Sequence, residues 1–164
     1  VMYNNTTDAH QESLDYVYKI RDDWNLNFYE TYPIKYTMKS LVKRWGGAVF
    51  LRRYCTYYMK IQPTAHFIKD MGYKTREGIA ITGMRREEKG RKNITVIQKT
   101  KRGRYYQASP IYNWKRTDVE ELIKRNNLPV NPVYEYHKRC GCVHCFDLKW
   151  ADDISPRIQK SSRQ

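Results

Sequence analysis

Three of the chain's four cysteines stand together in the segment Arg139-Cys140-Gly141-Cys142-Val143-His144-Cys145, here called the cysteine loop. The fourth, Cys55, lies far upstream. Cysteines separated by one residue bridge poorly because their Cβ atoms point apart. Four thiolates are the ligand set of a 4Fe–4S cluster or a tetrahedral zinc ion. The spacing therefore favours one metal or cluster bound by Cys55, Cys140, Cys142 and Cys145, and the alternative is three exposed thiols and one buried cysteine.

The chain is strongly basic, with a formal net charge of +14 over 164 residues. Positive charge is concentrated between Arg85 and Arg104, where nine lysines and arginines meet only Glu87 and Glu88. Such a balance indicates anionic partners, which are nucleotides, nucleic acid or both. The alternative is a solvated loop face.

The length of the chain predicts one domain, or a large part of one, and the 40% apolar fraction is enough for a real core. No apolar run approaches the roughly 20 residues that span a bilayer, and no signal peptide is visible. Four cysteines in a chain of this length do not form a secreted disulfide scaffold. We therefore expect a cytoplasmic protein whose thiolates bind metal.

Strand and helix patterns alternate around these residues. Strands are expected at 1–3, 27–32, 78–82 and 94–98, and helices at 9–24, 37–44, around Cys55 and Lys60, at 63–71, and from 117 onward. The apolar run 78–82 predicts a buried parallel strand. Residues 117–120 have the pattern of a capping box that begins the last helix.

This alternation predicts an α/β fold, with a partial, mostly parallel sheet and helices on both faces. Ligands of such sheets bind beyond the carboxyl ends of the strands. The residues expected to bind a nucleotide or another anion are Asn5, Thr6, Lys60, Gly83 and Arg85. Arg85 offers a planar fork for phosphate or sulfate, with a salt bridge to Glu88 as the alternative. Lys60 either faces the same anion or lies in solvent.

Five motifs, in the family's order, resemble those of phosphoadenosine phosphosulfate (PAPS) reductase-like proteins in the adenine-nucleotide alpha-hydrolase superfamily. They are Asn5-Thr6-Thr7 with Gln11-Glu12-Ser13, Cys55 with Lys60 and Pro63, Gly83-x-Arg85-x-x-Glu88, Tyr112-Asn113-Trp114 with Asp118-Val119 and the run 127–134, and Arg139-x-Gly141-Cys142-x-x-Cys145. The resemblance covers residues 1–150, which we take as a PAPS reductase-like domain, and residues 151–164 form a basic C-terminal tail.

The resemblance implies a Rossmann-like fold that binds an adenine nucleotide, either ATP or PAPS, and it favours a 4Fe–4S cluster over zinc. It implies an enzyme, as the full-length protein, of the oxidoreductase or sulfur transferase type. Such an enzyme would reduce, activate or transfer sulfur, including in nucleic-acid modification such as phosphorothioation. The alternative is a non-catalytic nucleic-acid-binding module with a structural zinc site.

The sequence also departs from the family pattern. Thr56 stands in place of the second cysteine of a pair, so Cys140 is the expected replacement ligand. Asn5 stands where the family usually has aspartate. The family's first strand, its Ser-Gly-Gly-x-Asp-Ser phosphate loop and its C-terminal cysteine are not found in these 164 residues. Either the chain is a fragment of a longer protein, or other residues or a partner protein complete the nucleotide pocket. Because the C-terminal cysteine is not found, we favour sulfur activation or transfer over reduction.

Overall fold

The structure is a computed structural model that describes residues 1–46, 53–88, 95–100, 103–137 and 141–144. Of the predicted metal ligands, Cys55 and Cys142 lie within these ranges, whereas Cys140 and Cys145 lie outside them. The tail predicted at 151–164 also lies outside the described residues.

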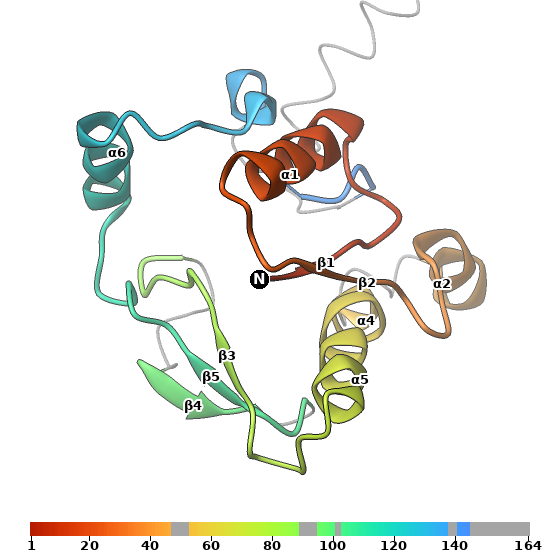
Figure 1. Cartoon of the computed structure of the whole chain (residues 1–164). Helices are drawn as coiled ribbons and strands as arrows, with labels where there is room; N and C mark the ends of the chain where they lie inside the picture. The colour runs from red at the N-terminus through yellow and green to blue at the C-terminus, as the bar shows by residue number, and fades with distance from the viewer. Residues whose placement is uncertain (47–52, 89–94, 101–102, 138–140, 145–164) are drawn as a thin grey trace, which may run out of the picture.

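The chain begins with a β–α–β unit. Strand β1 (Met2–Asn4) and strand β2 (Tyr29–Thr31) pair in parallel, with Met2 opposite Tyr29 and Asn4 opposite Thr31. Helix α1 (Gln11–Asp23) connects them and covers one side of the pair (Figure 1). Its Tyr18 meets the ring of Phe28 edge-on. The helix predicted at 9–24 and the two strands are therefore confirmed.

Helices α2 (Met38–Trp45), α4 (Tyr54–Thr56) and α5 (Gln62–Asp70) follow, and a π-helical turn, η1 (Tyr57–Ile61), joins the last two. The Thr37 hydroxyl accepts the Ser40 N–H and caps α2, as predicted. The buried side chains of Met38, Leu41 and Met59 form the core between these helices. Helix α5 contacts β2, so helices lie on both sides of the β1–β2 pair (Figure 1).

A second sheet has the strand order β3–β5–β4, with β3 (Ile79–Ile81), β5 (Tyr106–Ala108) and β4 (Ile97–Lys99). Strand β5 runs parallel to β3 and antiparallel to β4, which is the edge strand predicted at 94–98. The prediction that 78–82 is buried was wrong, because Ile79 and Ile81 are 62% and 76% exposed. They share with Ile97 one face of the sheet, which no described helix covers.

Helix α6 (Arg116–Arg125) and a 3₁₀ turn, η2 (Pro132–Glu135), are the last helical elements of the described chain. Helix α6 begins earlier than predicted. Its N-cap is Lys115, whose N–H donates to Oδ2 of Asp118 at 2.8 Å. The capping box predicted at 117–120 was therefore wrong by two residues, and Glu120 instead pairs with Arg116.

The predicted α/β class with mostly parallel strands is confirmed, although the strands divide between two sheets. In the described part of the chain, no helix has the length and apolar character needed to cross a membrane. The carboxyl ends of β1 and β3, where ligand-binding residues were predicted, therefore belong to separate sheets.

Candidate nucleotide and cysteine-loop site

Residues 5–9, here called the β1 turn, leave the carboxyl end of β1. Asn5, Thr6 and Asp8 are all buried, which is unusual for short polar residues in a turn. The Asn5 side-chain oxygen accepts the Thr7 N–H at 2.9 Å, and this bond closes a local turn. Thr7 has φ 57°, a left-handed conformation that residues other than glycine adopt uncommonly.

A carboxylate lies beside this turn although Asn5 itself has none. The Asn5 amide donates to Oε1 of Glu30 at 2.8 Å, and the Tyr18 hydroxyl donates to the same oxygen at 2.8 Å. Partial burial raises the pKa of Glu30, but hydrogen bonds from Asn5, Tyr18 and Tyr32 outweigh it and leave the pKa below its ordinary value. The sequence analysis missed Glu30. A charged residue in the middle of strand β2 was the feature of the sequence that could have indicated it.

The cysteine loop packs directly on the β1 turn. The Thr6 hydroxyl lies 3.3 Å from Sγ of Cys142, and Ala9 forms an antiparallel bridge with Cys142. The Val143 N–H donates to the main-chain oxygen of Asp8 at 2.6 Å. Two motifs that were predicted separately, and that lie more than 130 residues apart, thus form one site.

Asp8 holds the same loop through its side chain. Its Oδ2 accepts the His144 N–H at 3.2 Å, and its Oδ1 lies 2.5 Å from Nδ1 of the His144 ring. The Asp8 side chain is 8% exposed and that of His144 is 65% exposed. Sequence analysis did not identify Asp8, because only the tertiary contact reveals its partner.

Helix α1 positions the segment that leads to the cysteine loop. The buried Asn131 amide donates to Oγ of Ser13 at 3.1 Å, and the Tyr16 hydroxyl donates to the Pro129 oxygen at 2.8 Å. A cavity of about 420 Å³ lies between α1 and this segment. None of the predicted site residues lines that cavity, so it lies apart from the β1 turn.

Cys55 and Cys142 are half-buried free thiols. Cys55 lies in α4 and packs against the core of Met38, Leu41 and Met59, while Lys60 is exposed in the π turn. Within the described ranges, no group of three or more His, Cys, Asp or Glu residues can hold a metal. The thiols of Cys55 and Cys142, with the Thr6 hydroxyl beside the Cys142 sulfur, are suitable as part of a metal site with thiolate ligands. The convergence of all four cysteines on one site stays a prediction.

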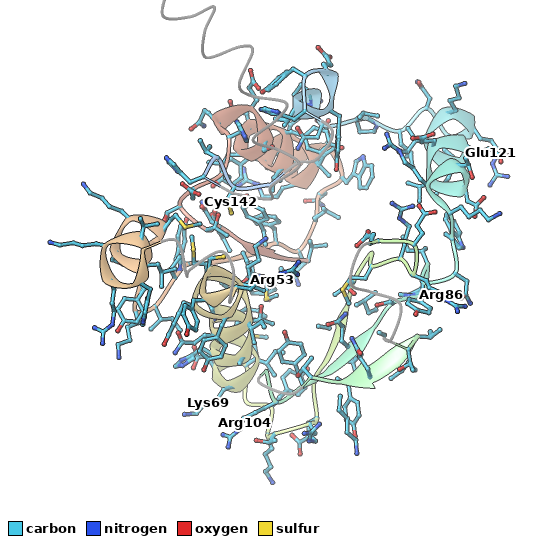
Figure 2. All side chains as sticks on the ribbon, turned by 180° about the vertical axis from the view of Figure 1, so that it is seen from behind. Arg53, Lys69, Arg86, Arg104, Glu121 and Cys142 are labelled. Atoms are coloured by element: carbon cyan, nitrogen blue, oxygen red, sulfur yellow. The ribbon has the colours of Figure 1, made fainter. Side chains whose placement is uncertain are left out.

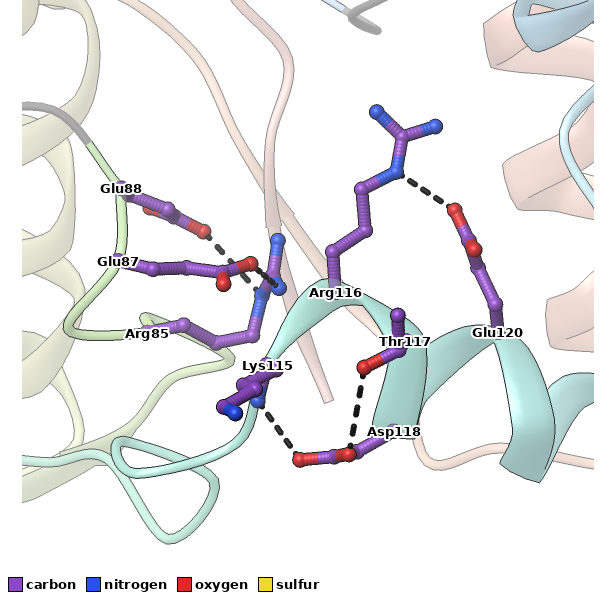
Figure 3. A network of polar contacts seen from close by, with 8 residues as sticks. All are labelled: Arg85, Glu87, Glu88, Lys115, Arg116, Thr117, Asp118 and Glu120. Carbon is purple, nitrogen blue, oxygen red and sulfur yellow. Dashed lines mark hydrogen bonds and ion pairs between the residues drawn. The ribbon is translucent and has the colours of Figure 1, made fainter.

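Gly83 and Arg85 lie after β3, away from the β1 turn. The Arg85 guanidinium pairs with Glu87, and its Nε lies 3.8 Å from Oε1 of Glu88, as expected from the salt-bridge alternative (Figure 3). No hydrogen bond or ion pair among the described residues joins Gly83 or Arg85 to the β1 turn. In Figure 2, Arg86, next to Arg85, and Cys142 lie in different halves of the molecule.

Solved structures with the same architecture bind nucleotides or phosphate. The PAPS reductase of Candida auris, in a phosphate complex, aligns with a TM-score of 0.64 at 18% identity, over 87% of this chain and 68% of that chain. The FMN adenylyltransferase of Candida glabrata, with FMN and the ATP analog AMPCPP, aligns with a TM-score of 0.65 at 14% identity, over 87% and 42%. These similarities define the fold as Rossmann-like.

The family follows from the sequence. The profile of the phosphoadenosine phosphosulfate reductase domain matches residues 1–147, so the chain belongs to that family. The adenosine 5'-phosphosulfate reductase of Oceanobacillus iheyensis is 30% identical over 85% of this chain, and that of Burkholderia cepacia is 24% identical over 86%. The chain spans 58% and 57% of the length of these two relatives.

Proposed function

We propose that the β1 turn binds an adenine nucleotide, ATP or PAPS, beside a 4Fe–4S cluster held by Cys55, Cys140, Cys142 and Cys145. The protein would then act in sulfur reduction, activation or transfer. The observation that carries the proposal is the 3.3 Å contact between Thr6 and Cys142, which joins the nucleotide motif to the cysteine loop. The names of the relatives, which are reductases of adenosine 5'-phosphosulfate and of phosphoadenosine 5'-phosphosulfate, support it.

The β1 turn offers preformed polar groups to a nucleotide. Asn5 is held by Glu30 and by the Thr7 N–H, so its amide is ordered before any ligand binds. Preorganised polar groups lose little entropy on binding. Gly83 follows β3 in the second sheet, where its missing side chain would let a phosphate approach the backbone.

The two cationic side chains of the predicted site differ in exposure and in their ion pairs. Lys60 is exposed and available to an anion. Arg85 is 17% exposed and paired with Glu87 and Glu88, so it must exchange these carboxylates for phosphate or sulfate. Phosphate can replace them because it fits the planar fork of guanidinium donors with two hydrogen bonds, as a carboxylate does.

The cysteine loop would supply three thiolates, and Cys55 would supply the fourth. When bound, a 4Fe–4S cluster supplies a thiolate-ligated redox centre. The Thr6 hydroxyl, placed 3.3 Å from the Cys142 sulfur, would adjust the electron density on that ligand. The basic residues of the chain would offset the negative charge of four thiolates.

Calorimetric titration of the full-length protein with ATP and with PAPS tests the nucleotide proposal. A nucleotide that extends from the β1 turn to the end of β3 would meet Arg85, and Arg85→Gln should then weaken binding by about 10-fold or more, the effect of losing one charged hydrogen bond. Arg86→Gln removes the same charge from the exposed neighbour and should leave affinity within about twofold. If neither nucleotide binds, the enzyme proposal is wrong. Iron, sulfide and zinc analysis after anaerobic purification separates a cluster from zinc.

The net charge of +14 favours a second candidate, a nucleic-acid-binding module with a structural zinc site. Nucleic acid is also the substrate class expected if the sulfur chemistry serves phosphorothioation. Retention on DNA should then fall steeply as salt rises, because released counterions dominate such binding. Zinc content with salt-dependent DNA binding and no nucleotide affinity would support the non-catalytic module. DNA binding that is insensitive to salt would contradict it.

A further inference from the structure

Asp8 gives the cysteine loop three hydrogen-bond acceptors. Its main-chain oxygen accepts the Val143 N–H at 2.6 Å, Oδ2 accepts the His144 N–H at 3.2 Å, and Oδ1 lies 2.5 Å from Nδ1 of His144. An ionised carboxylate only accepts hydrogen bonds, so Nδ1 is the ring nitrogen that carries the proton in this contact. One residue of the β1 turn thus contacts two successive residues of the loop.

The burial of Asp8 indicates what these contacts are for. Its side chain is 8% exposed, and a buried carboxylate is costly unless it is hydrogen-bonded. Within the described residues, His144 provides every hydrogen bond to that carboxylate. The hydrogen bonds to the loop therefore offset the cost of burying the charge.

Asp8 is also two residues from Thr6, whose hydroxyl lies beside the Cys142 sulfur. Between these contacts, Ala9 and Cys142 form a β-bridge. A ligand that contacts the preformed β1 turn would restrain Thr6 and Asp8 further, and so would act on Cys142 through Thr6 and on Val143 and His144 through Asp8.

We propose that Asp8 is a positioning residue that couples ligand binding at the β1 turn to the order of the cysteine loop. The inference rests on the nucleotide site proposed above. Binding at the turn restricts Asp8, and Asp8 restricts residues 141–144 through Val143 and His144. Thermodynamic coupling is reciprocal, so a state of Cys142 that fixes the loop also strengthens nucleotide binding.

Hydrogen exchange of the full-length protein, read by mass spectrometry, tests this coupling. Without nucleotide, Asp8→Ala should speed exchange in peptides that span 141–144 about tenfold, the effect of losing one charged hydrogen bond. Asp23→Ala is the matched control, because it removes an exposed carboxylate from α1 and should leave loop exchange unchanged. His144→Ala keeps the hydrogen bonds from the Val143 N–H and the His144 N–H to Asp8, so it should speed exchange less than Asp8→Ala does. If Asp8→Ala does not fold, His144→Ala is the variant to measure.

The second arm adds ATP or PAPS. In the wild type, nucleotide should slow exchange both at residues 5–8 and at 141–144. In Asp8→Ala, protection at residues 5–7 should persist while the added protection of the loop is lost, which a purely structural role would not produce. Protection of the turn without protection of the wild-type loop would overturn the coupling but leave the proposed function intact. No protection anywhere would overturn the nucleotide site, while unchanged loop exchange in both variants would overturn the role of Asp8 by itself.

Discussion

Replacing Asn5 by aspartate would restore the residue type of the family motif, yet we expect it to destabilise this protein. The Asn5 amide nitrogen lies 2.8 Å from Oε1 of Glu30 and donates to it. In Asn5→Asp a carboxylate oxygen takes the place of that donor. Two carboxylates would then face each other in a largely buried site, since Asn5 is 8% exposed.

The size of the effect follows from two contributions. Losing a hydrogen bond to a charged group costs about 1.5–3 kcal/mol. Two like charges 4 Å apart repel by about 4 kcal/mol at the effective dielectric near a protein surface. Side-chain movement and proton sharing relieve part of this repulsion, so we expect the free energy of unfolding to fall by about 2–4 kcal/mol at pH 7.

The pH dependence has a definite sign. The folded-state pKa of Glu30 is lowered in the wild type, so its contribution to stability is present above the unfolded pKa and is lost as pH falls through the folded pKa. In Asn5→Asp, repulsion raises one pKa of the pair, so the penalty is present above that pKa and fades as a proton binds. The difference between variant and wild type should therefore shrink from pH 7 toward pH 4.

Urea denaturation at the two pH values measures this difference. Asn4→Asp is the matched control, because the Asn4 side-chain oxygen accepts the hydroxyls of Thr31 and Thr64 and a carboxylate can accept both. We expect it to cost less than about 1 kcal/mol. An Asn5→Asp protein as stable as the wild type at pH 7 would refute the reasoning, and so would a penalty that grows as pH falls.

Three further predictions concern the core, the β1 turn and the cysteine loop. Leu41→Ala should lower the free energy of unfolding by about 2–5 kcal/mol in urea denaturation, because Leu41 is fully buried, while exposed Val42→Ala should change it by less than about 0.5 kcal/mol. Thr7→Gly should raise the free energy of unfolding by about 0.5–1 kcal/mol and raise the melting temperature, because Thr7 has φ 57° and glycine adopts this conformation without strain. An unchanged melting temperature would argue against backbone strain at Thr7. Cys142→Ser should reduce the iron bound per chain after anaerobic purification, whereas Val143→Ala should not, and equal iron in both would contradict the ligand set.

The local elements were largely predictable because their signals are local. Leu14, Val17 and Tyr18 recur at helical spacing, and α1 forms there. Strand β5, by contrast, is the three residues Tyr106–Ala108, which are too few to show a period. The apolar run that became β3 predicted a strand correctly, but periodicity cannot tell whether a helix will cover its faces, so the exposure of Ile79 and Ile81 was not foreseen.

The site was predictable in its parts and not in its assembly. The resemblance located Asn5, Thr6 and Cys142 as members of two motifs, yet nothing in their spacing indicated that Thr6 touches Cys142. Glu30 and Asp8 were missed for the same reason, because each is defined by a partner on another segment. Arg85 shows the opposite case, since neighbouring glutamates, visible in the sequence, account for its contacts in the structure.

The π turn at Tyr57–Ile61 determines from which side of helix α4 the Cys55 side chain projects. Its i→i+5 bond, from the Gln62 N–H to the Tyr57 oxygen, places one residue more in that turn than an α-helix would hold. Beyond it, α5 is tied to the end of β1 by the Thr64 hydroxyl, which donates to the Asn4 side chain at 3.2 Å. Each residue of an α-helix turns the chain by about 100°, so the extra residue rotates α4 by about that angle relative to an unbroken helix. The number of residues between Cys55 and Thr64 therefore governs the direction in which the Cys55 thiol points. Deleting one residue from the π turn would point the thiol to another side of the helix, although Cys55 itself would be unchanged.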